Sequence, residues 1–129
     1  MPLWNEYLEE ARKRGSLAYE LFVIESTPAK SPEELKKNLP DHLAYQAEQE
    51  KSGALAFAGP LSDLTGEQME GCGLIVYRAD SFEAAKAIAD ADPMHSTGTR
   101  TYTLRRWMIN EGSFRVDVKL SAQQVRLDQ

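Results

Sequence analysis

"ALAFAGPLSDLTGEQMEGCGLIVYRADSFEAAKAIADADP", residues 54–93, contains the elements that decide the fold. One apolar run closes at Gly59-Pro60, and a second, "GCGLIVYRA", follows it; both have the length and composition of strands. Ser81 is then suited to cap a helix that continues to about Asp90. The buried stripe of that helix would comprise Phe82, Ala85, Ile88 and Ala89. The segment predicts strand, strand and helix in that order.

The flanking segments extend this order in both directions. "AYELFVIE", residues 18–25, is of strand type, and "RTYTLRRWMIN", residues 100–110, predicts another strand. Between the first two strands, Ser31 and Pro32 are typical of a helix start, and Gly53 of a helix end. Pro40 is expected to kink or restart this helix. The core order βαββαβ is that of an α+β, ferredoxin-like fold with an antiparallel sheet.

The restarted helix would carry the second half of that crossover. Leu39, Leu43 and Ala47 fall on one face, which we expect to be buried. His42 would then lie in the first turn after Pro40.

Two segments lie outside this core of about residues 18–110. Residues 3–14 predict an amphipathic helix with Trp4, Tyr7, Leu8 and Ala11 on one face, and "FRVDVKL" within residues 113–121 predicts a strand at a sheet edge. The length of the chain favours a single domain over residues 1–129. Because both core helices lie on one face of the sheet, the other face needs a cover. A second copy of the chain is the obvious cover, so we expect a homodimer, and the N-terminal helix could also contribute.

Composition excludes several classes of partner. The net charge of -5 and pI of about 5.1 argue against nucleic acid or an anionic membrane. The third strand also lacks RNA-binding features, because Glu70 replaces a basic residue, and Cys72 and Leu74 stand where stacking rings are needed. A single cysteine and no apolar run of membrane-spanning length suit the cytoplasm. Cys72 itself is expected to be a small core residue.

His42 and Asp92 form the strongest candidate site. The positive end of the helix dipole would keep a His42 in the first turn neutral, as a general base requires. A carboxylate nearby would fix the tautomer of the ring and stabilise its charged form, which suits isomerisation or elimination. The alternative is that Asp92, which precedes Pro93, only ends a helix and that His42 is solvated.

These segments resemble the YciI-like (YCII-related) family over roughly Tyr19 to Ile109. The motif elements are His42, Gly53, the Ala-Gly-Pro-Leu of residues 58–61, and Asp92-Pro93. The resemblance implies a dimeric α+β barrel in which His42 and Asp92 are the active-site pair, with Gly59 and Pro60 as candidates for substrate binding. A few members of this family are dehydrochlorinases or lactone-processing enzymes. Met94 departs from the family pattern, which usually has phenylalanine after Asp-Pro.

Other polar residues near the pair leave alternatives open. His95 is a candidate substrate-binding residue or a solvated loop side chain, and together with His42 and Asp92 it could form a metal site. Nothing in the spacing requires a metal, and we expect neither metal nor cofactor. Three arginines could hold a carboxylate: Arg100, Arg105 and Arg106. Strand alternation sends the last two to opposite faces of the sheet.

The sequence thus supports two hypotheses of function. The first is an enzyme of isomerase or lyase/dehydrochlorinase type, in which His42 and Asp92 perform acid/base chemistry on a small organic acid or lactone-like substrate. The second is a non-catalytic module of the same fold that binds a small ligand or another protein. A histidine coupled to the aspartate favours the first.

Overall fold

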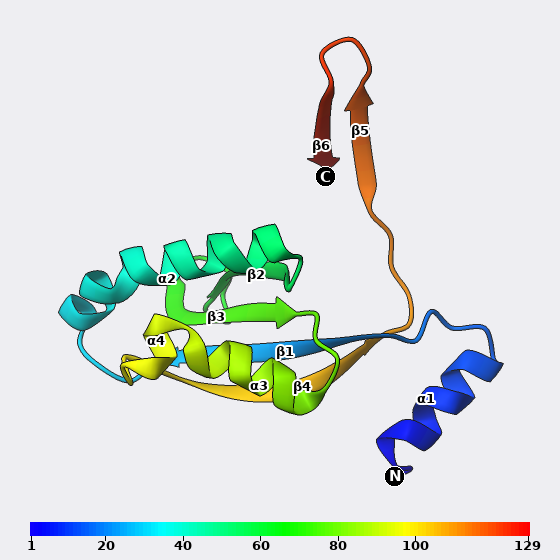
Figure 1. The fold of residues 1–129 in the computed structure, drawn as a ribbon, viewed down its shortest axis with the longest axis horizontal. Coiled ribbons are helices and arrows are strands. Elements are labelled where there is room, and N and C mark those ends of the chain that lie inside the picture. The colour runs from blue at the N-terminus through cyan, green and yellow to red at the C-terminus, as the bar shows by residue number, and fades with distance from the viewer. The chain divides into compact units, whose positions relative to one another are not determined.

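The main sheet gathers strands from both halves of the chain. Its four strands are β1 (Tyr19–Pro28), β2 (Leu55–Ser62), β3 (Met69–Tyr77) and β4 (Arg100–Ile109). Their order is β2-β3-β1-β4, and β3 runs antiparallel to both β1 and β2, with Ile24 paired to Ile75. The computed structural model describes residues 1–129, and most of this sheet belongs to a compact unit, Glu20–Trp107 (Figure 1).

The helices of this unit cover one face of the sheet. They are α2 (Pro32–Ser52), α3 (Phe82–Ala91) and the short α4 (Pro93–Ser96). Ile24, Ile75 and Tyr77 project from the covered face, where they form a core cluster with Ala89 of α3. Gln46 of α2 reaches the same face and donates a hydrogen bond to the Tyr77 hydroxyl at 2.9 Å. The predicted α+β, ferredoxin-like order with an antiparallel sheet is therefore confirmed.

Helix α2 is continuous through Pro40, so of the two predicted effects of this proline, a restart or a kink, the restart is wrong. The side chain of Ser31 accepts a hydrogen bond from the Glu34 amide at the start, and Gly53 ends the helix with φ of 88°. Pro40 lies inside the 21-residue helix. A proline there removes one backbone hydrogen bond, but the turns on either side keep theirs, so the helix continues. His42 consequently lies near the middle of α2, too far from its positive end for the helix dipole to act on the ring.

The buried face of α2 also differs from the prediction. Leu39, Leu43 and Ala47 remain exposed, whereas Gln46 is the buried residue of this helix. Leu39 and Leu43 line a cavity between the middle of α2 and the sheet. In α3 the predicted stripe is largely confirmed: Ala85 and Ala89 are buried and Ile88 packs against the core, while Phe82 is exposed.

The terminal segments, Met1–Tyr19 and Met108–Gln129, form a second compact unit. Helix α1 (Trp4–Lys13) is the amphipathic helix that the sequence predicts. Its Ala11 is buried in a cluster with Ala18 and Met108, and three partly buried side chains pack around it: Trp4, Tyr7 and Leu8. The amide of Leu17 donates to the carbonyl of Asn110, which ties the two segments together.

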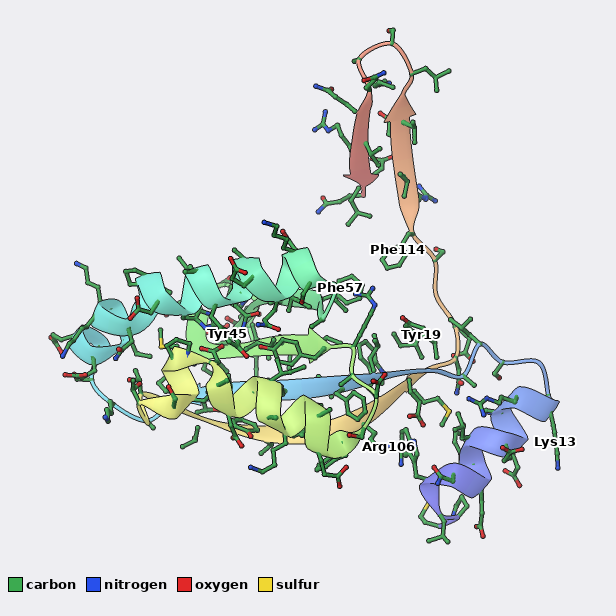
Figure 2. All side chains as sticks on the ribbon, in the orientation of Figure 1. Lys13, Tyr19, Tyr45, Phe57, Arg106 and Phe114 are labelled. Atoms are coloured by element: carbon green, nitrogen blue, oxygen red, sulfur yellow. The ribbon has the colours of Figure 1, made fainter.

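The end of the chain forms a hairpin. The strand predicted within residues 113–121 is present as β5 (Arg115–Lys119), but it pairs with β6 (Gln124–Asp128) in a separate two-stranded sheet. The predicted strand is thus an edge strand, and its partner, which was not predicted, follows after a short turn. Val116 pairs with Leu127 and Val118 with Val125, so one face of the hairpin is apolar and exposed (Figure 2).

Neither α2 nor any shorter helix is both long and apolar enough to span a lipid bilayer.

Candidate active site

A cavity of about 380 Å³ opens between the middle of α2 and the covered face of the sheet. Most of its lining is apolar, which is typical of sites for small organic ligands. Four polar side chains stand among these apolar residues: Ser26, His42, Gln46 and Arg100. The remaining lining residues are Leu39, Leu43, Ala58, Gly59, Pro60, Met69, Gly71, Cys72, Gly73, Leu74 and Ile75. All of them belong to the Glu20–Trp107 unit.

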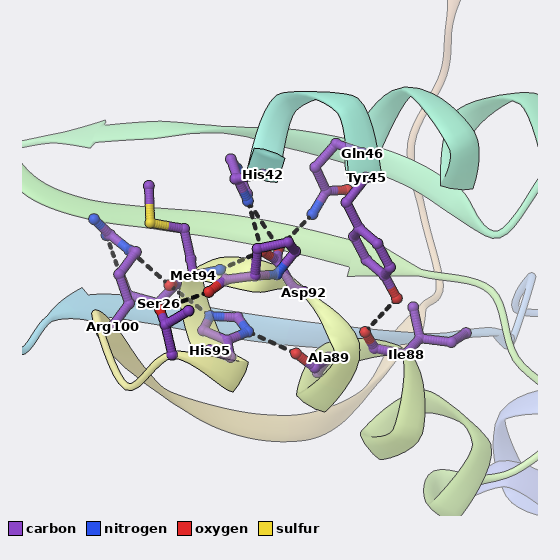
Figure 3. Close-up of polar contacts among 12 residues, drawn as sticks. Ser26, His42, Tyr45, Gln46, Ile88, Ala89, Asp92, Met94, His95 and Arg100 are labelled. Atoms are coloured by element: carbon purple, nitrogen blue, oxygen red, sulfur yellow. Dashed lines mark hydrogen bonds and ion pairs between the residues drawn. The ribbon is translucent and has the colours of Figure 1, made fainter. Parts of the chain in front are cut away.

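His42 and Asp92 meet at this cavity although fifty positions separate them (Figure 3). Nδ1 of His42 lies 2.8 Å from both carboxylate oxygens of Asp92. The Asp92 side chain is fully buried, and that of His42 is 20% exposed. The structure therefore pairs the two residues of the predicted site, with the aspartate inside and the histidine at the cavity.

The protonation of the pair follows from its hydrogen bonds. Burial alone would raise the pKa of Asp92, but the hydrogen bonds from His42 and from the Met94 amide outweigh it and hold the pKa below its ordinary value. An ionised carboxylate only accepts hydrogen bonds, so the proton of the neutral imidazole must be on Nδ1. Nε2 of His42 then carries a lone pair, and no group of the chain hydrogen-bonds to it.

Local sequence explains why Asp92 is held so firmly. Pro93 moves Asp92 out of helical geometry, to φ of -60° and ψ of 126°, so that α3 ends there. The same residue caps α4, because its side chain accepts from the Met94 amide at 2.9 Å. The predicted helix exit at Asp92 is present, whereas the single turn of α4 was not predicted.

Gln46 is a member of the site that the sequence analysis missed. Its Nε2 donates to Asp92 and to the Tyr77 hydroxyl, both at 2.9 Å, and only 8% of the residue is exposed. Its Oε1 is buried without a hydrogen-bond partner. The spacing gave a usable signal, because residues four apart in a helix lie on the same face and His42 precedes Gln46 by four.

His95 lies beside the cavity rather than in its lining. Its Nδ1 is 2.8 Å from the Ala89 carbonyl, which only accepts, so Nδ1 is the donor. In the neutral ring Nε2 therefore accepts from the Ser26 hydroxyl at 2.9 Å. The ring also packs against Tyr102 at 4.7 Å. Both nitrogens are thus engaged in structural hydrogen bonds, and neither is directed to a ligand.

Of the three candidate arginines, only Arg100 reaches the cavity. Its Nε donates to the Ser26 hydroxyl and its Nη2 to the Ser26 carbonyl, both at 2.8 Å, and Nη2 also donates to the Gly71 carbonyl. Arg106 pairs with Glu20 at 2.8 Å, and Arg105 lies 3.9 Å from Glu25. Ser26 had no signal in the sequence, since a lone serine in a strand is unremarkable.

Strands β2 and β3 contribute glycine and proline residues to the cavity as well as apolar side chains. Gly59 and Pro60 line the cavity, as their predicted role in binding requires. Gly73 is paired with Pro60, and a Cβ on Gly73 would come within 3.1 Å of the Gly59 carbonyl. Cys72 is half-buried, with its Sγ 3.8 Å from Thr27 Oγ1 on the face opposite Ser26, so the expected place in the core is wrong.

A metal site would require the side chains of His42, Asp92 and His95 to converge. His42 and Asp92 meet, but His95 turns to Ser26 and Ala89, and no group of three or more His, Cys, Asp or Glu residues is arranged to hold a metal ion.

These features define a ferredoxin-like domain with a histidine–aspartate pair at one cavity. Residues 18–108 match the family model of the YCII-related domain, and the chain belongs to that family. The predicted resemblance is therefore confirmed.

The chain is similar in sequence to one bacterial protein and in structure to another. The chain is 37% identical over 57 residues to protein YjpA of Bacillus subtilis (strain 168), which is 44% of this chain and 60% of that protein. In structure it resembles 5-chloro-2-hydroxyhydroquinone dehydrochlorinase (TftG) of Burkholderia phenoliruptrix AC1100, solved in complex with 2,5-dihydroxybenzoquinone. That likeness has a TM-score of 0.50 at 19% identity and covers 67% of this chain and 92% of the other, which supports the fold.

Proposed function

We propose that this protein is an enzyme in which His42 acts as the general base. The observation that carries the proposal is the hydrogen bond between His42 Nδ1 and the buried Asp92 carboxylate. It fixes the proton on Nδ1 and leaves the Nε2 lone pair at a cavity of about 380 Å³. Asp92 orients the ring and stabilises the imidazolium that forms when Nε2 takes a proton from the substrate.

The cavity supports a small substrate with a largely apolar body. Leu39, Leu43 and Met69 would contact that body, and the backbone at Gly59 and Pro60 would contact its edge. We propose isomerisation or elimination of the lyase/dehydrochlorinase type, on a small organic acid or lactone-like compound. The named activity and ligand of the structural neighbour support a ring derived from an aromatic compound.

The tautomer of His42 tests this proposal without a known substrate. We expect ¹⁵N NMR of the histidine rings at neutral pH to show His42 protonated on Nδ1, because Asp92 accepts from that atom. In Asp92→Ala the constraint is lost and the ring should shift toward the Nε2-protonated form. Asp41→Ala, which removes an exposed carboxylate next to His42, is the matched control and should leave the tautomer unchanged. A wild-type ring protonated on Nε2 would rule out the base.

We also propose that the protein works as a homodimer in the cytoplasm, consistent with its single cysteine. The supporting observation is the sheet face opposite the helices, where Phe57 and Trp107 are 42% and 43% exposed. A second copy would bury both rings. Light scattering at micromolar concentration should give twice the 14.5 kDa of one chain, and Trp107→Glu should lower the mass toward one chain. A wild-type mass of one chain would contradict the dimer.

A further inference from the structure

Arg100 is a cation without an ion-pair partner in direct contact. Its hydrogen-bond acceptors are two backbone carbonyls and one hydroxyl, none of which carries a charge. It forms no ion pair with any carboxylate of the chain, in contrast to Arg105 and Arg106. Nη1, the remaining nitrogen of its guanidinium, has no hydrogen-bond partner although the residue lines the cavity.

The surroundings of Arg100 make this arrangement unfavourable in the empty site. Burial lowers the pKa of Arg100 and outweighs the attraction of Cys72 and Asp92, because the guanidinium loses water without gaining a counter-charge in direct contact. Guanidinium pairs with carboxylate and other oxyanions through short, charge-assisted hydrogen bonds. An anionic ligand in the cavity would supply both the missing charge and the acceptor for Nη1.

The guanidinium is also fixed in position. Ser26 accepts from Nε with its hydroxyl oxygen and from Nη2 with its carbonyl, and its own hydroxyl proton is directed to His95. Gly71 adopts φ of 91° and presents its carbonyl to Nη2 as well. Because three acceptors hold one edge of the guanidinium plane, Nη1 is placed for a ligand at little further cost in side-chain entropy.

We propose that Arg100 is the anion receptor of this cavity and determines its specificity. Its ligand carries a negatively charged oxygen, as a carboxylate or an ionised ring hydroxyl, which binds Nη1. The apolar body of the ligand packs against Leu39, Leu43 and Met69, in reach of His42. This inference rests on the proposed function, to which it adds the charge of the substrate and the residue that selects it.

The test compares charged and neutral probes of one shape. Benzoate and benzamide are titrated into the wild type, Arg100→Gln and Arg105→Gln while ¹H–¹⁵N NMR follows the amides that line the cavity. Benzoate should bind the wild type and Arg105→Gln alike, and at least about tenfold more weakly to Arg100→Gln, because a charged hydrogen bond is lost. Benzamide should not distinguish the three proteins. Arg105→Gln is the matched control, since it removes the same charge at an exposed, already paired position.

A second probe distinguishes a carboxylate ligand from a ligand with an ionised ring hydroxyl. 2,5-Dihydroxybenzoquinone, which is ionised at neutral pH, represents the ring hydroxyl, and the tighter binder of the two anions identifies the oxyanion class. Should Arg100→Gln fold poorly, the wild type alone suffices: benzoate must shift the Arg100 Nε resonance and benzamide must not. Equal binding of both anions to all three proteins, or no binding of either anion, would overturn the inference.

Failure of this inference can be told from failure of the proposed function. If the anions bind Arg100→Gln as well as they bind the wild type while His42 keeps its Nδ1 proton, only the role of Arg100 is lost. If His42 is protonated on Nε2 while Arg100 still selects anions, the base is lost and the cavity remains a specific anion site.

Discussion

Replacing His42 with glutamine is expected to lower kcat/KM by about 10²–10⁴-fold, the usual contribution of a positioned general base. Glutamine can still hydrogen-bond to Asp92, but its amide cannot take up a proton at neutral pH. The assay would use whichever small organic acid or lactone the wild type turns over. The loss should appear in kcat, because His42 acts in the transition state, in which the proton is being transferred.

Asp92→Asn provides the companion variant for this prediction. Its side chain has the same size, but its amide can hydrogen-bond to either tautomer of His42, so the ring is no longer fixed with its lone pair at the cavity. We expect a loss of activity of the same order, since the two residues act as one unit. Asp41→Asn should retain wild-type activity. Wild-type kcat/KM in His42→Gln would contradict the catalytic role.

The second large effect concerns stability. Asp92→Ala is expected to lower the free energy of unfolding by about 3–5 kcal/mol, because a buried partner of several hydrogen bonds is removed. The lost contacts are those to His42, Gln46 and the Met94 amide, and the last of them is also the cap of α4. Urea denaturation at pH 7 would measure the change. Asp41→Ala, at an exposed position, should differ from the wild type by less than about 0.5 kcal/mol.

The difference in unfolding free energy between the wild type and Asp92→Ala should decrease in acid. The pKa of Asp92 is lowered in the folded protein relative to its ordinary value of 3.8. Its ionised form therefore stabilises the fold fully above pH 3.8, and this contribution is lost as the pH falls through the folded pKa. The gap in unfolding free energy between the wild type and Asp92→Ala should thus narrow as the pH falls below 3.8. A gap that widened in acid would show that the carboxylate is not the stabilising form.

Local signals made most of the fold predictable. Ser31 and Ser81 act as caps because their short side chains reach an amide three residues on, at Glu34 and Ala84. Gly53 ends α2 because it accepts a positive φ without strain. These interactions span three or four residues and can be recognised in sequence. The hairpin partner β6 could not, because its short polar-apolar alternation in Gln124–Asp128 has no turn motif before it.

The site was predictable only in part. His42 and Asp92 could be named from motif resemblance, but their contact depends on how α2 packs over α3 and α4. The predicted helix start at Pro40 placed His42 at a helix dipole that does not reach it, whereas the structure shows that a hydrogen bond to Asp92 fixes the tautomer of the ring. Arg100 was one of three candidates, and its selection required knowing that carboxylates on β1 already pair with the other two.

The continuity of α2 also constrains how such sequences can diverge. His42 and Gln46 both contact Asp92 from one face of the helix, and an inserted residue between them would rotate His42 by about 100° away from it. A residue added between Ser31 and Pro40 would in addition displace Leu39 from the cavity and Asn38 from Thr99. The register of α2 should therefore be kept, and the spacing His-x-x-x-Gln inherited intact. That spacing, found with a distant Asp-Pro, would mark the same pair in sequences too divergent to align.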